Sequence, residues 1–190
     1  EAAFKYLVIG SIGSSFILLG TIFMYSRFHT LNIAQIGADL ANHNYDPVSI
    51  FALALLLAGY AVKAFLVPCH TWPPDAHMAA PSSISMILSA VMSKTGVYAI
   101  IRILFTMYQA MDKPSMQYMI VFWGTLTMVV GISMAIVQND LKRMLAFSSV
   151  SQIGYIIIGV GMATSLGVTA GVYHLINHVV FKSLLFLCAG

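Results

Sequence analysis

Three ionisable side chains recur at a helical spacing near the end of the sequence. His174, His178 and Lys182 follow one another at intervals of four positions, so on a helix they lie on one face, within an arc of about 80°. Histidine titrates near neutral pH and exchanges protons at either ring nitrogen. The pattern favours a proton relay. It does not favour a zinc site of the HExxH type, because Leu175 stands where that motif needs a glutamate.

Two more lysines occur inside apolar stretches. A charge at the centre of a bilayer costs about 2.5–3.5 kcal/mol on insertion scales, so a fold retains one only where it is paired, hydrated or used. Lys94 lies in the middle of its stretch, which predicts a functional role. Lys63 lies five residues before Pro68. For Lys63, snorkelling of the amine to the membrane surface is an alternative to a role in proton transfer.

The composition indicates the elements that must position these groups. Hydrophobic residues make up 59% of the 190 residues and charged ones only 8%, whereas a soluble domain has about 25% charged residues. The sequence therefore predicts an all-α, polytopic transmembrane helical bundle, as a single transmembrane domain over 1–190. Charge-poor runs predict about six spans, at 6–24, 48–67, 82–105, 115–137, 144–161 and 166–190. A polar loop is predicted at 25–47, between the first two spans.

Prolines interrupt the second span. Four of the six prolines fall between positions 68 and 81, so we expect a discontinuous helix with Pro68 and Pro74 in the break. Backbone groups freed by such a break are tolerated where they line a hydrated cavity. Asp75 is expected to be structural, either capping a short second half-helix or holding a backbone N–H.

Other features exclude several classes of protein. A net charge of +3 is too small to indicate nucleic-acid binding. Cys69 and Cys188 show no metal-binding spacing and are expected to be free buried thiols. No flavin, quinone or iron–sulfur motif is visible, so we expect no cofactor and no metal. The first residue is a glutamate, which suggests an internal fragment of a longer subunit.

Three blocks of the sequence resemble one known family. They are similar to the signatures of the antiporter-like proton-translocating membrane subunits, found in complex I, in Mrp-type cation/proton antiporters and in membrane-bound hydrogenases. The blocks begin with Pro68-x-His70-x-Trp72-x-Pro74-Asp75-Ala76, Asn139-Asp140-Leu141-Lys142-Arg143 and His174-x3-His178. Pro73 departs from the family pattern, which usually has a bulky apolar residue there.

The resemblance implies two inverted repeats, each with a discontinuous helix. It matches Lys63 to the lysine of the first broken helix, Lys94 to the lysine of the next helix, and His178 and Lys182 to the central relay, with His174 as an added member. The glutamate that pairs with the Lys63 equivalent and the exit-side residue of the family are missing from this chain, so the chain alone is not expected to pump.

The expected function is proton translocation through the membrane arm of a redox-driven complex of the NADH:quinone oxidoreductase or membrane-bound hydrogenase kind. In such a complex this chain would move ions while partner subunits perform the redox chemistry. Two alternatives stay open: an Mrp-type cation/proton antiporter subunit without redox chemistry, and a structural membrane subunit. The expected partners are other membrane subunits, the lipid bilayer, and protons alone or protons with sodium. The expected location is a bacterial or archaeal cell membrane rather than an organellar inner membrane.

Overall fold

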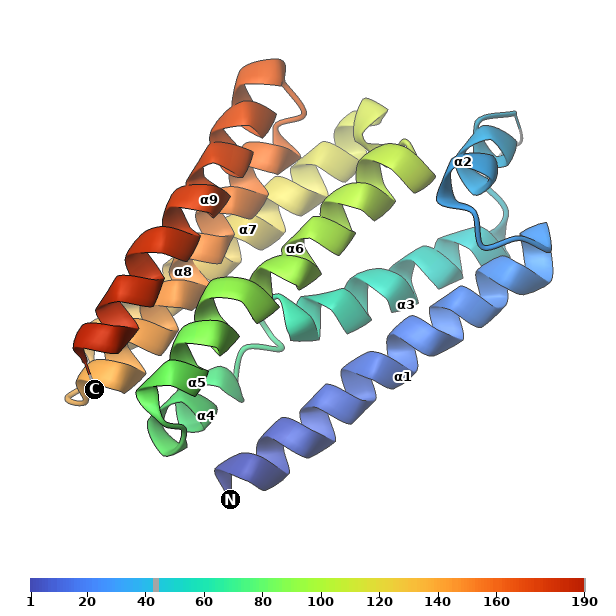
Figure 1. Ribbon diagram of the computed structural model, residues 1–190. Coiled ribbons are helices and arrows are strands. Elements are labelled where there is room, and N and C mark those ends of the chain that lie inside the picture. Colours follow the sequence, from blue (N-terminus) through green and yellow to red (C-terminus); the bar gives the residue numbers. More distant parts are fainter. Residues whose placement is uncertain (43–44, 190) are drawn as a thin grey trace.

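The computed structural model describes residues 1–42 and 45–189 as a chain of helices (Figure 1). Two predicted loop residues, His43 and Asn44, and the last predicted residue of the sixth span, Gly190, lie outside the described residues. In order, the elements are α1 (Ala2–Phe28), α2 (Ile33–Asn42), α3 (Pro47–Lys63), α4 (Pro73–Ala79), α5 (Ser82–Ile87), η1 (Leu88–Met92), α6 (Ser93–Ile101), η2 (Arg102–Met107), η3 (Ala110–Asp112), α7 (Pro114–Ile136), α8 (Leu141–Gly161) and α9 (Ser165–Cys188).

Most predicted spans appear, with shifted ends. The described chain has five helices long and apolar enough to cross a membrane, and α3 is a shorter apolar helix. Residues Ser82–Met107 form one of the five, here called the central helix, in which η1 and η2 are π-helical turns. The structure differs from the loop predicted at 25–47. There α1 continues to Phe28, and the segment that follows contains the helix α2.

The helices pack in two groups joined by the central helix. α7, α8 and α9 lie side by side, α1 packs on α3, and the central helix touches α3 on one side and α9 on the other (Figure 1). Small residues bring the backbones close. A Cβ atom added to Gly59 of α3 would lie 2.6 Å from the Gly13 carbonyl oxygen of α1. Close approach of this kind is typical of helices that pack inside a membrane.

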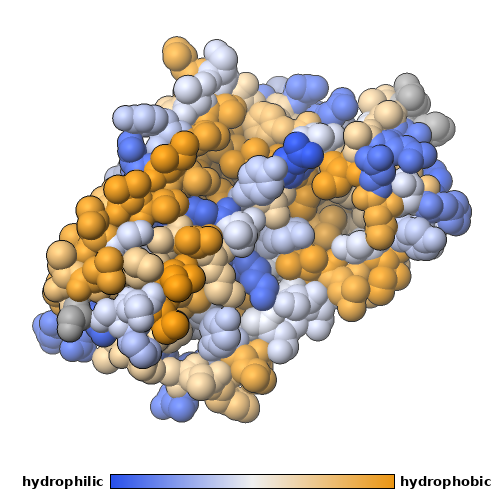
Figure 2. All heavy atoms as spheres, in the orientation of Figure 1, coloured by the Kyte–Doolittle hydropathy of each residue, from blue (hydrophilic) through white to orange (hydrophobic). Residues whose placement is uncertain are grey.

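Large apolar side chains remain exposed along the outside of the bundle. Phe4, Phe122 and Leu166 have exposed fractions of 70%, 70% and 82%. Figure 2 shows broad hydrophobic areas on one face, with hydrophilic side chains gathered mainly toward the ends of the helices. Water does not favour so much apolar surface, whereas lipid or neighbouring apolar protein does.

The second span is discontinuous, as predicted. α3 ends at Lys63, residues 64–72 are not helical, and α4 begins at Pro73. The helix ends before Pro68 because Phe65 takes a left-handed backbone conformation, with a φ of 62°, which an α-helix cannot continue. Pro73, the departure from the family pattern, lies with Pro74 in the first turn of α4, where proline is well tolerated.

Side chains, rather than water alone, bind the backbone groups of the break. The Val67 N–H donates to Thr127 Oγ1 at 3.3 Å, and the Val67 carbonyl accepts from Trp123 Nε1 at 2.5 Å. Both partners come from α7. The Val62 carbonyl accepts from Trp72 Nε1 at 3.2 Å. Aromatic and hydroxyl side chains thus bind part of the backbone that the break leaves free.

Candidate functional site

Lys63 occupies the last position of α3, directly before the break. Its amine is half-buried and faces α1, where Nζ lies 3.5 Å from the Gly10 carbonyl oxygen. Its backbone packs on the central helix: a Cβ atom on Gly96 would lie 3.0 Å from the Lys63 carbonyl carbon. Lys63 and Lys94 therefore belong to two helices in direct contact, although the Lys63 amine turns toward a third.

Lys94 lies on the central helix and is buried, with only 6% of its surface exposed. Its amine donates to the carbonyl oxygen of Ser89 and to Ser93 Oγ, the latter at 3.2 Å. Ser89 lies in the π-helical turn η1, one turn before the lysine. π-helical turns are rare and frequently mark functional sites.

Lys182 is buried on α9, with 2% of its surface exposed. Its amine donates to the Leu145 carbonyl oxygen at 3.0 Å and to Ser148 Oγ, both on α8. α9 packs on the π-helical turn η1, which holds Ser89, the hydrogen-bond partner of Lys94. The packing of the central helix on α9 therefore brings two predicted relay groups from distant parts of the sequence together.

The two predicted histidines continue along α9 from Lys182. The His178 ring is fully buried, and neither of its ring nitrogens has a hydrogen-bond partner within residues 1–42 and 45–189. The His174 ring stacks on it with centroids 6.2 Å apart. His174 Nε2 lies 2.7 Å from Gln152 Oε1 on α8. This pair borders an open cavity of about 360 Å³.

A pair of serines connects the Lys94 and Lys182 sites. Ser89 Oγ lies 2.9 Å from Ser149 Oγ, and the Ser149 hydroxyl donates to the Leu145 carbonyl oxygen at 3.0 Å. That carbonyl also accepts from Lys182. The sequence interpretation missed these serines. Ser149 lies in a block that resembles the family, but its partner on the central helix cannot be read from spacing along one helix.

His77 is a second residue that the interpretation missed. It lies on α4 with its side chain fully buried. Its ring stacks on Phe186, one turn after Lys182 on α9, with centroids 4.8 Å apart. Neither ring nitrogen has a hydrogen-bond partner in the described part of the chain. The only signal in the sequence was its place two residues after Asp75.

Asp75 does not cap α4. Its carboxylate makes no cap hydrogen bond, and instead pairs with Lys5 of α1 at 2.7 Å and with Arg143 of α8 at 3.8 Å. Pro68 lies in the break, as expected, whereas Pro74 lies after it, in the first turn of α4. The predicted groups thus form a buried cluster of Lys94, His178 and Lys182, with His174 at its edge and Lys63 one helix away.

Comparison with known proteins decides the family. The model of the family described as "NADH:quinone oxidoreductase/Mrp antiporter, TM" matches residues 1–190. The chain belongs to this family. It is therefore part of an integral membrane protein, and the predicted family, helical bundle and bacterial or archaeal membrane location are confirmed.

The family relatives are subunits of multi-subunit membrane complexes. NADH-quinone oxidoreductase subunit N of Desulforudis audaxviator is 37% identical over 190 residues, which are 100% of this chain and 38% of that protein. An archaeal respiratory complex, the membrane-bound sulfane sulfur reductase, contains a chain with a TM-score of 0.90 and 36% identity, covering 99% of this chain and 32% of that one. The Mrp complex from Dietzia sp. contains one with a TM-score of 0.89 and 31% identity, covering 98% and 34%. The chain thus spans between 32% and 38% of the length of these relatives.

Proposed function

We propose that the protein containing this chain moves protons across the membrane through the cluster of Lys94, His178 and Lys182. The observation that carries the proposal is the burial of two amines whose hydrogen-bond partners are linked to each other through the hydroxyls of Ser89 and Ser149. In the described residues no carboxylate forms an ion pair with either lysine. The hydrogen-bond partners of the two amines are neutral oxygen atoms, two backbone carbonyls and two serine hydroxyls.

Two such amines compete for protons. A buried charge without a partner is costly, and a second like charge nearby adds repulsion. Protonation of Lys94 therefore disfavours protonation of Lys182, and a proton held by one amine is readily given up when the other gains one. His178 and His174 offer further acceptors toward Gln152. In this arrangement His174 carries the proton between the buried cluster and the cavity beside Gln152.

Lys63 would set the direction of transfer. It forms no ion pair within the part of the chain that the structure describes. We propose that a carboxylate elsewhere in the complete protein pairs with it, as the family resemblance implies. Withdrawal of that carboxylate would favour release of the Lys63 proton toward Lys94, because an amine that loses its counter-charge binds its proton less tightly.

We further propose that the chain is one transmembrane domain, internal to a longer subunit of a redox-driven complex. The likeness to NADH-quinone oxidoreductase subunit N and to the sulfane sulfur reductase supports this assignment. The likeness to the Mrp complex favours a second candidate, a cation/proton antiporter subunit. Proton uptake that begins only when an electron donor is oxidised supports the redox assignment, and uptake driven by a sodium gradient alone supports the antiporter.

The test of the proton path is Lys94→Ala in the complete protein, in its complex, reconstituted in vesicles. Alanine is a good helix former, so the complex should assemble, while proton transport should fall by about tenfold to 100-fold, since water bridges only part of the gap. Lys94→Arg should not restore transport, because guanidinium hardly releases its proton. Lys113→Ala, which removes an exposed lysine, is the control. Normal assembly with wild-type transport in Lys94→Ala would show that Lys94 is structural.

A further inference from the structure

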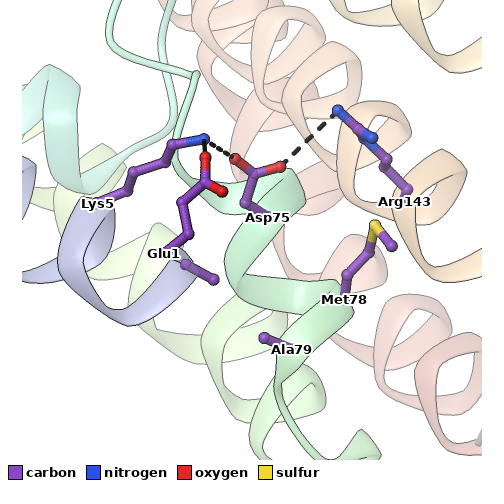
Figure 3. Close-up of a pocket in the computed structure, with 7 residues that line it drawn as sticks. Glu1, Lys5, Asp75, Met78, Ala79 and Arg143 are labelled. Carbon is purple, nitrogen blue, oxygen red and sulfur yellow. Dashed lines mark hydrogen bonds and ion pairs between the residues drawn. The ribbon is translucent and has the colours of Figure 1, made fainter.

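Three helices meet through charged side chains at the end of the bundle that holds α4. Asp75 Oδ2 of α4 lies 2.7 Å from Lys5 Nζ of α1, and Asp75 Oδ1 lies 3.8 Å from Arg143 Nη2 of α8. Lys5 also lies 3.0 Å from a carboxylate oxygen of Glu1. Figure 3 shows these side chains pointing toward one another around a cavity of about 550 Å³. We call Lys5, Asp75 and Arg143 the ion-pair junction.

The helix at the centre of the junction has little stability of its own. α4 has seven residues, fewer than an isolated helix needs in order to persist. Non-helical residues 64–72 precede it, and it ends at Ala79, just before Pro81. Its position must therefore be set by contacts with neighbouring helices.

α4 presents different groups on its two sides. Asp75 is partly exposed and faces the junction, whereas His77, two residues later, is fully buried against Phe186. The His77 carbonyl accepts a hydrogen bond from Ser85 Oγ at 3.1 Å, which ties this side of α4 to α5. A movement of α4 at the junction would thus move His77 relative to Lys94 and Lys182.

We propose that Asp75 is a positioning residue. By pairing with Lys5 and Arg143 it holds α4 between α1 and α8, and so holds His77 in place against Phe186, one turn after Lys182 on α9. The placement of α4 does not depend on the proposed proton path. The effect of that placement on transport rests on the proposed function, so the two are measured separately below.

The exposure of the junction sets the size of the effect. The side chains of Lys5, Asp75 and Arg143 have exposed fractions of 41%, 26% and 40%, so water and salt screen the charges. Pairs of this kind change the ratio of the correctly placed to the displaced helix by about twofold to fivefold. The competing explanation is that the buried apolar side of α4 places the helix alone, in which case loss of the Asp75 charge changes nothing.

The first experiment measures where α4 lies. In the complete protein, in its complex, Cys69 and Cys188 are replaced by alanine, and spin labels are attached at Met78→Cys on α4 and Leu141→Cys on α8. Both positions are exposed. Asp75→Asn should increase the displaced population in the label-to-label distance distribution by about twofold to fivefold. Asp75→Glu should restore the wild-type distribution, and Asp112→Asn, the same change in the turn η3, should not alter it.

The second experiment measures proton transport in the same variants. We expect Asp75→Asn to lower transport in proportion to the displaced population, and Asp75→Glu to restore it. Lower transport with an unchanged distance distribution would overturn the positioning role. A changed distribution with unchanged transport would overturn the link to His77, while Lys94→Ala tests the proton path separately.

If the Asp75 variants fail to assemble, the ion-pair junction can still be tested in the protein that retains Asp75. Raising the salt concentration from about 0.05 M to about 0.5 M weakens partly exposed ion pairs. The displaced population should then grow in the protein that retains Asp75, and fall again when the salt is removed. A distance distribution that does not respond to salt would overturn the proposal.

Discussion

The amine of Lys182 is held by neutral oxygen atoms on α8. It donates to the Leu145 carbonyl and to the Ser148 hydroxyl, and Lys94 is held in the same way by Ser89 and Ser93. A carbonyl or a hydroxyl accepts a bond from either the ammonium or the neutral amine. Each lysine can therefore lose its proton without leaving a carboxylate stranded beside it, which a permanent salt bridge would not allow.

The Ser148 hydroxyl gives a test of this arrangement. In Ser148→Ala the buried Lys182 loses one acceptor, which for a hydrogen bond to a charged group costs about 1.5–3 kcal/mol. We expect proton transport to fall by about tenfold, since 1.4 kcal/mol on the limiting step corresponds to that factor. Transport in vesicles and assembly of the complex are measured together.

A neighbouring serine provides the matched control. Ser183 lies beside Lys182 on α9, but its hydroxyl donates only to the Val179 carbonyl, one turn back on the same helix. Ser183→Ala should leave transport close to the wild-type rate. An equal loss in both variants would show that the integrity of α9, rather than the acceptor of Lys182, controls transport.

The sequence identified the groups on one helix better than those shared between helices. His174, His178 and Lys182 could be predicted because a spacing of four places side chains on one helical face. His77, Ser89 and Ser149 could not, because their contacts arise where α4, the central helix and α8 pack together. Spacing along the chain carries no information about which helices are neighbours.

At the scale of elements, one glycine lets α3 approach the central helix. A Cβ atom added to Gly96 would lie 2.7 Å from the Ala64 backbone nitrogen, which is closer than real Cβ contacts allow, and backbone cannot move aside as a flexible side chain can. We predict that Gly96→Ala destabilises the protein by about 1–3 kcal/mol, measured by thermal unfolding in detergent.

Gly10 is the matched control for that substitution. An added Cβ atom there meets nothing within 4 Å. Gly10→Ala should leave the unfolding temperature unchanged or raise it slightly, because alanine favours a helix over glycine. Equal destabilisation by both substitutions would mean that helix propensity, and not the close approach at the break, controls stability.

The first turn of α3 predicts a dependence on pH. Asp46 lies at the N-cap, accepts from the Ser49 N–H at 3.2 Å and pairs with Arg27 of α1 at 2.9 Å. The hydrogen bond from the Ser49 hydroxyl, and then the Arg27 charge, lower the pKa of Asp46. Because the folded pKa is below the unfolded one, the carboxylate stabilises the fold above its ordinary pKa, and this contribution is lost as the pH falls through the lowered pKa.

Asp46→Asn should therefore make the stability of the protein depend less on pH in the acidic range. We expect the thermal unfolding midpoint of the wild type to fall more steeply than that of Asp46→Asn as the pH drops from neutral to about 3. Ser49→Ala should raise the pKa of Asp46 toward its ordinary value, which can be followed by NMR titration. Parallel curves for wild type and Asp46→Asn would contradict this account.

The prolines predicted the broken helix, but they did not predict what fills the break. α3 ends at Lys63 rather than near Pro68, since the left-handed residue Phe65 comes first. Trp123 and Thr127 of α7 bind the freed backbone at Val67. α7 carries no charge, so its hydropathy predicted only a span and gave no sign of this role.

At the scale of the whole molecule, acidic and basic groups are separated. The six carboxylates of the sequence all fall outside α3 and the five long helices: Glu1, Asp39, Asp46, Asp75, Asp112 and Asp140. Lys94 and Lys182 lie inside. Among the described residues no group of three or more histidine, cysteine or acidic side chains could hold a metal ion.

This separation predicts which ion uses the path. In vesicles that contain the complete complex, replacement of sodium by choline should change the rate of proton uptake by less than about twofold, because no step among Lys94, Lys182 and His178 requires a metal cation. Lys94→Ala should lower the rate equally in both solutions. Proton uptake that stops without sodium, together with sodium binding that is lost in Lys94→Ala, would contradict a path for protons alone.

The fold class could be predicted from composition, since a chain with 8% charged residues cannot cover itself in water. The order of the spans followed from the apolar runs. Their arrangement in space did not, because the approach of the central helix to both α3 and α9 depends on local shape, such as the missing side chain at Gly96. That arrangement decides which of the predicted groups meet.

Because of the π-helical turn η1, the direction of Lys94 depends on the length of the central helix as much as on its composition. Such a turn contains one residue more than an α-helical turn, and Lys94 lies two residues after its end. Rewinding Leu88–Met92 as a plain α-helix, with all its residues kept, would rotate everything that follows by about 100°. Lys94 would then turn away from the serines without having been altered itself. The direction in which Lys94 points thus depends on how the residues of η1 are wound. Substitutions at Lys94 alone would not reveal this dependence.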